Sequence, residues 1–182
     1  MILSTPLTPA HAHQVVKSYT LSEAILAKFE QEVQKFPAEQ RQSAVMACLT
    51  LVQFEHGYVS QDHEMEVAQF LPMPAIAVHE VATFYNMYNL SPVGRFKLNV
   101  CTNLSCQLKG GEDALSHVCK KLGVQPGGTT PDGLFTVQPA ECLGACADAP
   151  VLLVNDRAMC SFMTPEKLDE LIDGLRTLKE LS

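Results

Sequence analysis

Basic side chains are scarce in this sequence. Its 182 residues include 13 lysines and arginines against 20 aspartates and glutamates, so the formal charge is −7 and the pI is about 5.3. Neither half of the chain is basic, and no cluster of lysine and arginine is present to neutralise phosphates. The charge pattern therefore excludes a nucleic-acid partner.

Long apolar runs are missing as well. A helix that spans a bilayer needs roughly 20 apolar residues, whereas the longest apolar stretches here, such as Ala44–Leu51, are short and interrupted. The segment Met1–Ala12 has no basic start followed by a long apolar region, so we expect no secretory signal. We expect no direct membrane insertion and a cytoplasmic location, peripheral to a membrane at most through a partner.

Signatures of catalysis are also absent. The sequence has neither a Gly-x-Gly-x-x-Gly nor a P-loop motif to cradle phosphates, and no Cys-x-x-Cys for dithiol redox chemistry. His56, His63 and His79 fall on predicted helices or at their ends, with no carboxylate or nucleophile evident to pair with them. We therefore expect no catalytic residues in this chain.

Composition and periodicity predict three parts. Hydrophobic residues make up 47% of the chain and charged residues 18%, which supports a packed core. Residues 1–19 read as a flexible tail whose His11 and His13 are solvated. Residues 20–92 read as a small helical bundle, with apolar stripes that include Leu21, Ile25, Phe29, Val33 and Phe36, then Ala44, Val45, Cys48, Leu49 and Val52.

Four helices are expected in that second part. The first begins at Thr20, which has capping-box spacing to Glu23. The others begin at Pro37, Ser60 and Pro74, and they end at Gly57, at Phe70 and at about Tyr88, in that order.

Residues 93–182 follow a different pattern. Alternation predicts strands over 96–101, 134–138, 151–154 and 158–163, with a helix over 111–122 and a Gly/Pro-rich turn over 126–133. Thr164 is expected to cap a last helix, whose apolar stripe is Leu168, Leu171, Ile172, Leu175 and Leu178. This order predicts an α/β domain with a small mixed sheet, so the whole chain is of the α+β class.

Seven cysteines stand in a chain for which we expect a reducing compartment, so a disulfide framework is disfavoured. Four of them form two short motifs, Cys101-x4-Cys106 and Cys142-x3-Cys146, and each motif follows a predicted strand. If the two strands adjoin in one sheet, both loops project from the same edge and the four thiolates converge on one point. Cys48, Cys119 and Cys160 are expected to be packed as small hydrophobes.

Spacing alone leaves three explanations for the four thiols. Structural zinc usually takes pairs separated by two residues, whereas the gaps here are four and three. A [2Fe–2S] cluster needs two sulfurs on each of two irons, so wider pairs suit it better. The small residues Gly144, Ala145 and Ala147 would let backbone amides approach the cluster. An iron–sulfur site is favoured, while a zinc-stabilised interaction module and free thiols stay open.

Five segments together resemble a known family. They are Asn99–Cys106, Thr129–Phe135, Glu141–Cys146, His79–Tyr85 and Thr164–Ile172. These residues resemble the thioredoxin-like [2Fe–2S] subunit of the proton-pumping NADH:quinone oxidoreductase, respiratory complex I, over about residues 20–182. One departure is the segment 159–163, where many family members carry aromatic and acidic residues.

The resemblance implies a thioredoxin-like domain over residues 93–182 that holds one [2Fe–2S] cluster. By position, its four ligands are Cys101, Cys106, Cys142 and Cys146. It further implies single-electron exchange with FMN on the flavoprotein subunit, which also binds NADH, and contact with the multi-cluster subunit of the same complex. The complex lies at the inner membrane. Soluble NAD(P)-linked hydrogenases and formate dehydrogenases contain an equivalent subunit, which is the alternative.

Overall fold

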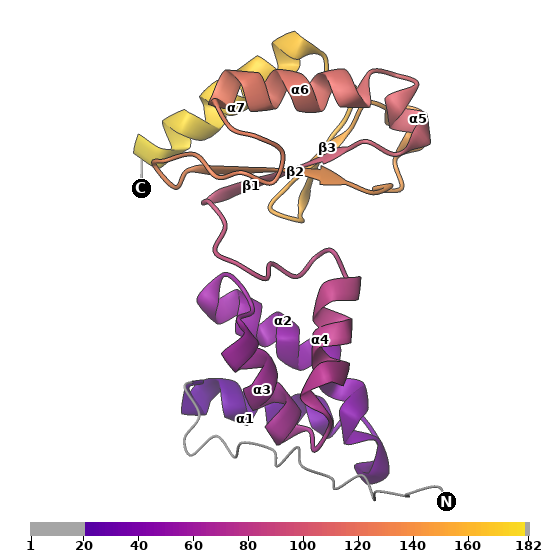
Figure 1. The fold of residues 1–182 in the computed structure, drawn as a ribbon, viewed down its shortest axis with the longest axis vertical. Coiled ribbons are helices and arrows are strands. Elements are labelled where there is room, and N and C mark those ends of the chain that lie inside the picture. Colours follow the sequence, from indigo (N-terminus) through magenta and orange to yellow (C-terminus); the bar gives the residue numbers. More distant parts are fainter. Residues whose placement is uncertain (1–20, 181–182) are drawn as a thin grey trace, which may run out of the picture. The chain divides into compact units, whose positions relative to one another are not determined.

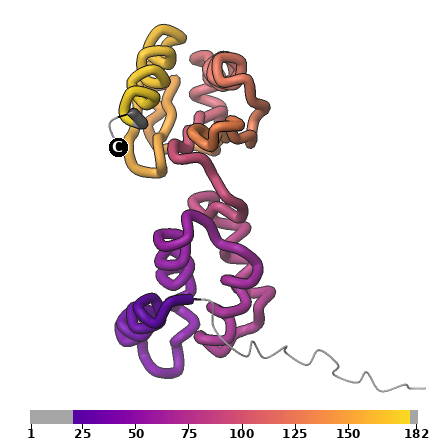
Figure 2. The backbone as a smooth tube through the Cα atoms, turned by 90° about the vertical axis from the view of Figure 1, so that its left-hand side faces the viewer, coloured from indigo at the N-terminus to yellow at the C-terminus, as the bar shows by residue number. Residues whose placement is uncertain are grey.

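The computed structural model describes residues 21–180 of the chain, with side chains up to residue 178. The predicted tail of residues 1–19, with His11 and His13, and the predicted cap Thr20 lie outside the described residues. The fold divides between Ser91 and Pro92 into two compact units, which we call the helical unit and the sheet unit (Figures 1 and 2).

The helical unit contains four α-helices and one 3-10 segment (Figure 1). Its core is built from the apolar stripes of these helices and includes Ile25, Phe29, Cys48, Leu49, Val52, Val67 and Val78. The expected helical bundle is therefore confirmed. The elements are α1 (Glu23–Val33), η1 (Ala38–Ala44), α2 (Val45–His56), α3 (Gln61–Phe70) and α4 (Ala75–Phe84).

Helix boundaries in this unit differ from prediction at both ends of α1 and after it. Ser22 caps α1, because its hydroxyl accepts a hydrogen bond from the Ile25 amide. Phe36 lies beyond the last turn of α1 and is exposed instead of joining the core. The helix predicted to begin at Pro37 is split, since residues 38–43 offer no apolar stripe and Gln40 leaves helical geometry (φ −116°, ψ 30°).

Helix α4 is shorter than predicted. It ends at Phe84, where Tyr85 takes an extended conformation (φ −91°, ψ 108°). This break lets Tyr88 return to the core, and its hydroxyl donates to the Met46 carbonyl at 2.8 Å. Because α4 ends early, the chain loses one helical turn and gains the contact of Tyr88 with the core.

The sheet unit follows the predicted order of strands and helices. Its four strands have the order β2-β1-β3-β4, with β1 and β2 parallel and the remaining pairs antiparallel. The small mixed sheet is therefore confirmed. The elements are β1 (Phe96–Cys101), α5 (Leu104–Gln107), α6 (Gly111–Leu122), β2 (Phe135–Ala140), η2 (Cys146–Asp148), β3 (Leu152–Val154), β4 (Ala158–Cys160) and α7 (Pro165–Glu180).

Helices α6 and α7 pack side by side against this sheet (Figures 1 and 2). Alternate residues of β1, from Phe96 to Val100, share one core with Val118 of α6 and Ile172 of α7. A polar clamp joins the two helices, because Asp169 lies 2.8 Å from His117 and 3.1 Å from Lys121. The predicted stripe of α7 stops short, since Leu178 is exposed.

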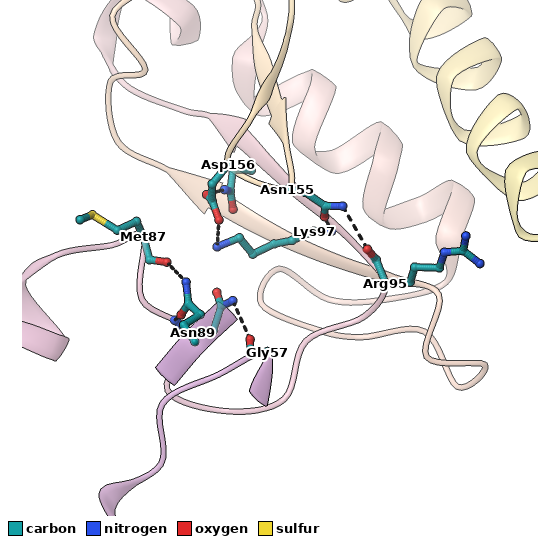
Figure 3. A network of polar contacts seen from close by, with 9 residues as sticks. Gly57, Met87, Asn89, Arg95, Lys97, Asn155 and Asp156 are labelled. Atoms are coloured by element: carbon teal, nitrogen blue, oxygen red, sulfur yellow. Dashed lines mark hydrogen bonds and ion pairs between the residues drawn. The ribbon is translucent and has the colours of Figure 1, made fainter. Parts of the chain in front are cut away.

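The turn between β3 and β4 carries the main polar network of the sheet (Figure 3). Asp156 forms an ion pair with Lys97 at 2.6 Å and accepts a hydrogen bond from Asn99. Asn155 donates to the Arg95 carbonyl at 3.1 Å. Alternation predicts Lys97 and Asn99 on the exposed side of β1, but both are buried. Buried polar groups need such partners, and the turn supplies them.

The strand predicted over residues 158–163 ends at Cys160, because Phe162 adopts a positive φ of 54° that extended backbone does not allow.

Within residues 21–180, none of the helices combines the length and the apolar character that crossing a bilayer demands.

Candidate metal centre

The first thiol pair sits between a strand end and a helix start. Cys101 is the last residue of β1, and Cys106 lies on α5, a single helical turn that the sequence did not predict. Both side chains are buried, with 2% and 1% of their surface exposed. Gly111 opens α6 directly against them: a Cβ there would lie 2.6 Å from the Cys101 carbonyl oxygen. Only glycine permits this approach.

The second thiol pair follows the neighbouring strand. Strand β2 ends at Ala140, whose carbonyl accepts the Thr102 amide at 3.0 Å. Because β1 and β2 are parallel neighbours, both loops leave the same edge of the sheet, as expected. The Sγ atoms of Cys142 and Cys146 lie 3.6 Å apart, and both residues are exposed.

Polar contacts hold the second loop on either side. Asn103, at the start of α5, donates to the Glu141 carboxylate at 3.0 Å. At the other end, the Ser161 hydroxyl donates to Asp148 at 3.1 Å, and the Phe162 amide donates to the Asp148 carbonyl at 2.8 Å. The loop is therefore anchored beyond its two cysteines, while the thiols themselves stay accessible.

The four thiols come together as two pairs. The Cys106 thiol forms a hydrogen bond with Cys101, and charge on Cys146 acts on Cys106 as well, so the pairs are neighbours. Leu143 and Ala145 of the second loop pack against the cluster of Cys101, Cys106 and Val151. Across residues 21–178, no group of three or more histidine, cysteine or carboxylate side chains is arranged to hold one metal ion. The four thiols, which the sequence predicts to converge on one point, are therefore arranged as two neighbouring pairs.

Backbone amides point at sulfur in both loops. Burial raises the pKa of the Cys106 thiol, and the Val151 amide, which donates to this sulfur, opposes that rise. The Gly144 amide donates to the Cys142 Sγ atom at 3.4 Å, with Gly144 in the left-handed region (φ 77°). Thiolates are the form that binds metal, and such donors stabilise them and tune a bound cluster.

This donor set fits a [2Fe–2S] cluster. Two thiolates about 2.3 Å from one tetrahedral ion are roughly 3.8 Å apart, close to the 3.6 Å between the Cys142 and Cys146 sulfurs. A cluster of two irons takes two such pairs, and two neighbouring pairs at one sheet edge are present. The amide donors from Val151 and Gly144 suit its sulfur ligands.

The remaining cysteines have packing roles, as expected. Cys48 is fully buried in the core of the helical unit, and burial raises the pKa of its thiol to about 12. Cys119 is buried in the core of the sheet unit, and the half-buried Cys160 packs against the same core. Burial raises the pKa of both of these thiols as well. In all three residues the raised pKa favours the protonated thiol.

One prediction about the histidines is wrong. His79 does have a carboxylate partner, because its Nδ1 atom lies 2.8 Å from the buried Glu64. The two residues are 15 positions apart on adjacent helices, so no local pattern links them. His63 forms a capping box with Ser60 at the start of α3 and stacks on His56, with ring centres 4.4 Å apart. These contacts fix α3 in the helical unit.

Comparison with known proteins agrees with this geometry. Residues 29–176 match the model of the thioredoxin-like [2Fe-2S] ferredoxin family, and the chain belongs to that family. Its relatives include NADH-quinone oxidoreductase subunit 2 of Thermus thermophilus, 41% identical over 84% of both chains. A further NADH-quinone oxidoreductase subunit, from Rhizobium meliloti, is 42% identical over 78% of this chain and 84% of the relative.

A solved structure shares the fold at lower identity. An NAD+-reducing [NiFe]-hydrogenase in the H2-reduced state aligns with a TM-score of 0.62 and 21% sequence identity. The alignment covers 74% of this chain and 22% of that chain, so the shared fold is a small part of the hydrogenase polypeptide.

Proposed function

We propose that this chain is a one-electron carrier whose [2Fe–2S] cluster is held by Cys101, Cys106, Cys142 and Cys146. The observation that carries the proposal is the placement of two thiol pairs at one edge of the sheet, one pair with its sulfurs 3.6 Å apart. The family match supports the identity of the cofactor. Bound there, the cluster takes up and releases one electron.

The residues of the chain have distinct tasks in this role. The buried pair, Cys101 and Cys106, is fixed by β1 and by the close approach of Gly111, so this side of the site is rigid. The exposed pair, Cys142 and Cys146, keeps the cluster near the surface, where an electron partner can approach. A site that holds its ligands still needs little reorganisation when the charge changes.

The chain then acts as a subunit of NADH:quinone oxidoreductase, as its relatives are named. In this arrangement FMN and NADH are bound by the flavoprotein subunit of the complex, and the multi-cluster subunit is the next neighbour. The chain converts no substrate by itself. It lies at the cytoplasmic side of the inner membrane and is held there through the complex.

Metal analysis of the full chain tests the cofactor. Anaerobically purified protein is expected to contain two irons and two sulfides, to be brown, and to give the electron paramagnetic resonance signal of a [2Fe–2S] centre once reduced. Cys106→Ser and Cys142→Ser should each abolish the signal. The matched control Cys119→Ala should keep it and lose only about 1–3 kcal/mol of stability.

Two rival functions give different results. A zinc-stabilised interaction module would be colourless and would contain zinc without sulfide. A subunit of a soluble NAD(P)-linked hydrogenase or formate dehydrogenase would keep the cluster but co-purify with different partners. The hydrogenase shares the fold at 21% sequence identity, whereas the oxidoreductase subunit from Thermus thermophilus is 41% identical over 84% of both chains. Assignment to NADH:quinone oxidoreductase is therefore better supported than assignment to a hydrogenase.

A further inference from the structure

The two loops that carry the thiol pairs are supported unequally. The first loop holds Cys101 and Cys106, which are buried and fixed by β1 and by the close approach of Gly111. The second loop holds Cys142 and Cys146, which are exposed and lie beyond the end of β2. Because a two-iron cluster takes ligands from both pairs, the spacing of the pairs depends on contacts that join the two loops.

A side-chain contact joins these loops just past the sheet. The last register pair of the parallel strands β1 and β2 is Cys101 with Ala140. Beyond that pair, the side-chain amide of Asn103 donates to the Glu141 carboxylate at 3.0 Å. Asn103 lies inside the first cysteine motif, and Glu141 directly precedes the second. The hydrogen bond therefore runs from one thiol loop to the other.

The side chain of Asn103 does not do what its position usually requires. Asn103 is the N-cap residue of α5, and asparagine is a preferred N-cap because its side-chain oxygen can accept a helix amide. Ser22 and Ser60 cap α1 and α3 in this way. Within the described residues, Asn103 makes no such cap bond. Since a carboxylate only accepts hydrogen bonds, the NH2 group of Asn103 faces Glu141 and serves the contact between the loops.

Glu141 also brings a negative charge next to Cys142. Asn103 is a neutral partner, so this contact does not offset the carboxylate charge. A [2Fe–2S] cluster gains one negative charge on reduction, and its potential depends on the charge around it. Like charges repel, so a carboxylate at this place opposes uptake of the electron. The bond and the charge of Glu141 therefore have separate consequences, one for the geometry of the site and one for its potential.

We propose that Asn103 and Glu141 form a clasp that positions the exposed thiol pair against the buried pair, and that the Glu141 charge lowers the reduction potential of the bound cluster. The proposal rests on the proposed function, because it assigns both residues to the site that holds the cluster. Both are positioning residues, since they act through the loops and not as ligands. The clasp slows release of the cluster, because release requires the two thiol pairs to separate.

Release of the cluster from the loaded full chain tests the bond. Asn103→Ala and Glu141→Ala should each lose the cluster to an iron chelator several-fold faster than the native chain, as followed by absorbance. The double variant should be no faster than the faster single variant, because both changes break the same bond.

Gln107→Ala is the matched control for the clasp. Gln107 lies on the same helical turn α5 and donates to the exposed Glu112 at 3.1 Å, so its bond joins α5 to α6 and not to the second loop. Its loss should leave the release rate within about twofold of the native rate.

Glu141→Gln separates the bond from the charge. Glutamine still accepts the Asn103 amide through its carbonyl oxygen, so cluster release should stay within about twofold of the native rate. Loss of the charge should shift the reduction equilibrium several-fold toward the reduced cluster, which is less than the ~59 mV of a tenfold change. Redox titration followed by electron paramagnetic resonance measures this shift. Asn103→Ala keeps the charge and should shift the potential less.

Denaturant unfolding of the iron-free variants separates positioning from folding. Equal midpoints are expected, because Asn103, Gln107 and Glu141 are all exposed. A lower midpoint for Asn103→Ala than for Gln107→Ala would overturn the positioning role. Cluster release from Asn103→Ala at the native rate, or equal acceleration in Gln107→Ala, would overturn the clasp, and a native potential in Glu141→Gln would overturn the role of the charge. A native chain without iron and sulfide would overturn the proposed function, and this proposal with it.

Discussion

The helical unit and the sheet unit place their cysteines differently. The helical unit closes one apolar core around Phe29, Leu49 and Val67, and its only described cysteine, Cys48, is part of that core. The sheet unit has an apolar core under α6 and α7, but its paired thiols lie outside that core: Cys101 and Cys106 form a small cluster with Val151, and Cys142 and Cys146 are exposed. The helical unit thus buries its cysteine in a closed core, whereas the sheet unit keeps paired thiols at an edge where a cofactor would bind.

This difference shows that the residues that stabilise the fold and the residues of the candidate site lie in different places. Large buried side chains supply most of the folding free energy of a domain. At the edge of the sheet unit few large side chains are buried, and the contacts of the second loop include the hydrogen bonds of Glu141 and Asp148 and the packing of Leu143 and Ala145. Metal binding to such a site is coupled to local folding. The comparison therefore predicts that disturbance of the cluster changes the sheet unit alone.

Removal of iron should give the largest effect. Chelation under reducing conditions is expected to speed hydrogen exchange in residues 101–106 and 142–148, because the metal no longer ties the loops together. Helices α2 and α3 should exchange as before. Hydrogen–deuterium exchange of the cluster-loaded and iron-free chain measures both, and equal acceleration in the two units would break the comparison.

Gly111→Ala should come next. The added Cβ would lie 2.6 Å from the Cys101 carbonyl and 2.9 Å from the Cys106 backbone, so α6 must shift away from the first pair. We expect a loss of about 3 kcal/mol and a lower cluster content, measured by denaturant unfolding and absorbance.

The control for this change is Gly174→Ala on α7, where a Cβ meets nothing within 4 Å. It should stabilise the sheet unit by about 0.5–1 kcal/mol, because alanine favours helix over glycine. A Gly111→Ala variant as stable and as brown as Gly174→Ala would show that the first thiol pair is not packed as described.

Cys48→Ala should weaken the helical unit only. Loss of the fully buried sulfur leaves a small cavity in the core, and we expect a cost of about 1–3 kcal/mol. The cluster content and its resonance signal should stay at the native level. A bleached Cys48→Ala protein would mean that the two units are coupled more strongly than their separate cores indicate.

Mild acid should have the smallest effect. Burial and the neighbouring His56 lower the pKa of His63 in the folded chain. The unfolded chain therefore binds more protons as the pH falls through about 6.5, so this contribution to stability is present at neutral pH and is lost on acidification. Protonation also removes the Nδ1 acceptor for the Ser60 amide at the start of α3.

The sheet unit should resist the same acid. Hydrogen bonds from His117 and Lys121 lower the pKa of Asp169, so its stabilising charge is kept in mild acid and is lost only as the pH falls below the usual carboxyl range. Thermal unfolding at pH 7.5 and about 5.5 measures the contrast. In His63→Gln, the glutamine side chain can still accept the Ser60 amide but does not titrate, and the acid sensitivity should shrink. Unchanged sensitivity in that variant would assign it to another group.

Local sequence patterns predicted most elements but only some of their ends. The strand Phe96–Cys101 and the helix Gly111–Leu122 followed from alternation and helical periodicity, and both are present with these bounds. Other boundaries depended on backbone conformations that no short pattern encodes: the kink at Gln40, the extended Tyr85 and the positive φ of Phe162. Each of these backbone conformations depends on tertiary contacts with the rest of the fold.

The candidate site divides in the same way. Motif spacing singled out the four candidate thiols and predicted that both loops leave one sheet edge if their strands adjoin, and the parallel pairing of β1 with β2 confirms the shared edge. It did not predict that Cys101 and Cys106 are buried while Cys142 and Cys146 are exposed. The pairing of His79 with Glu64 was also missed, because these residues meet only when α3 and α4 pack together.

The sequence by itself determined the chemistry of this protein: four thiols at spacings of four and three residues, no basic surface for nucleic acid, and an apolar content sufficient for two cores. The tertiary structure alone decided the environment of each thiol, because burial depends on which strands become neighbours. The parallel pairing of β1 with β2 joins loops about 40 residues apart in the sequence. Composition fixes what can bind, and packing fixes which side of the site faces a partner.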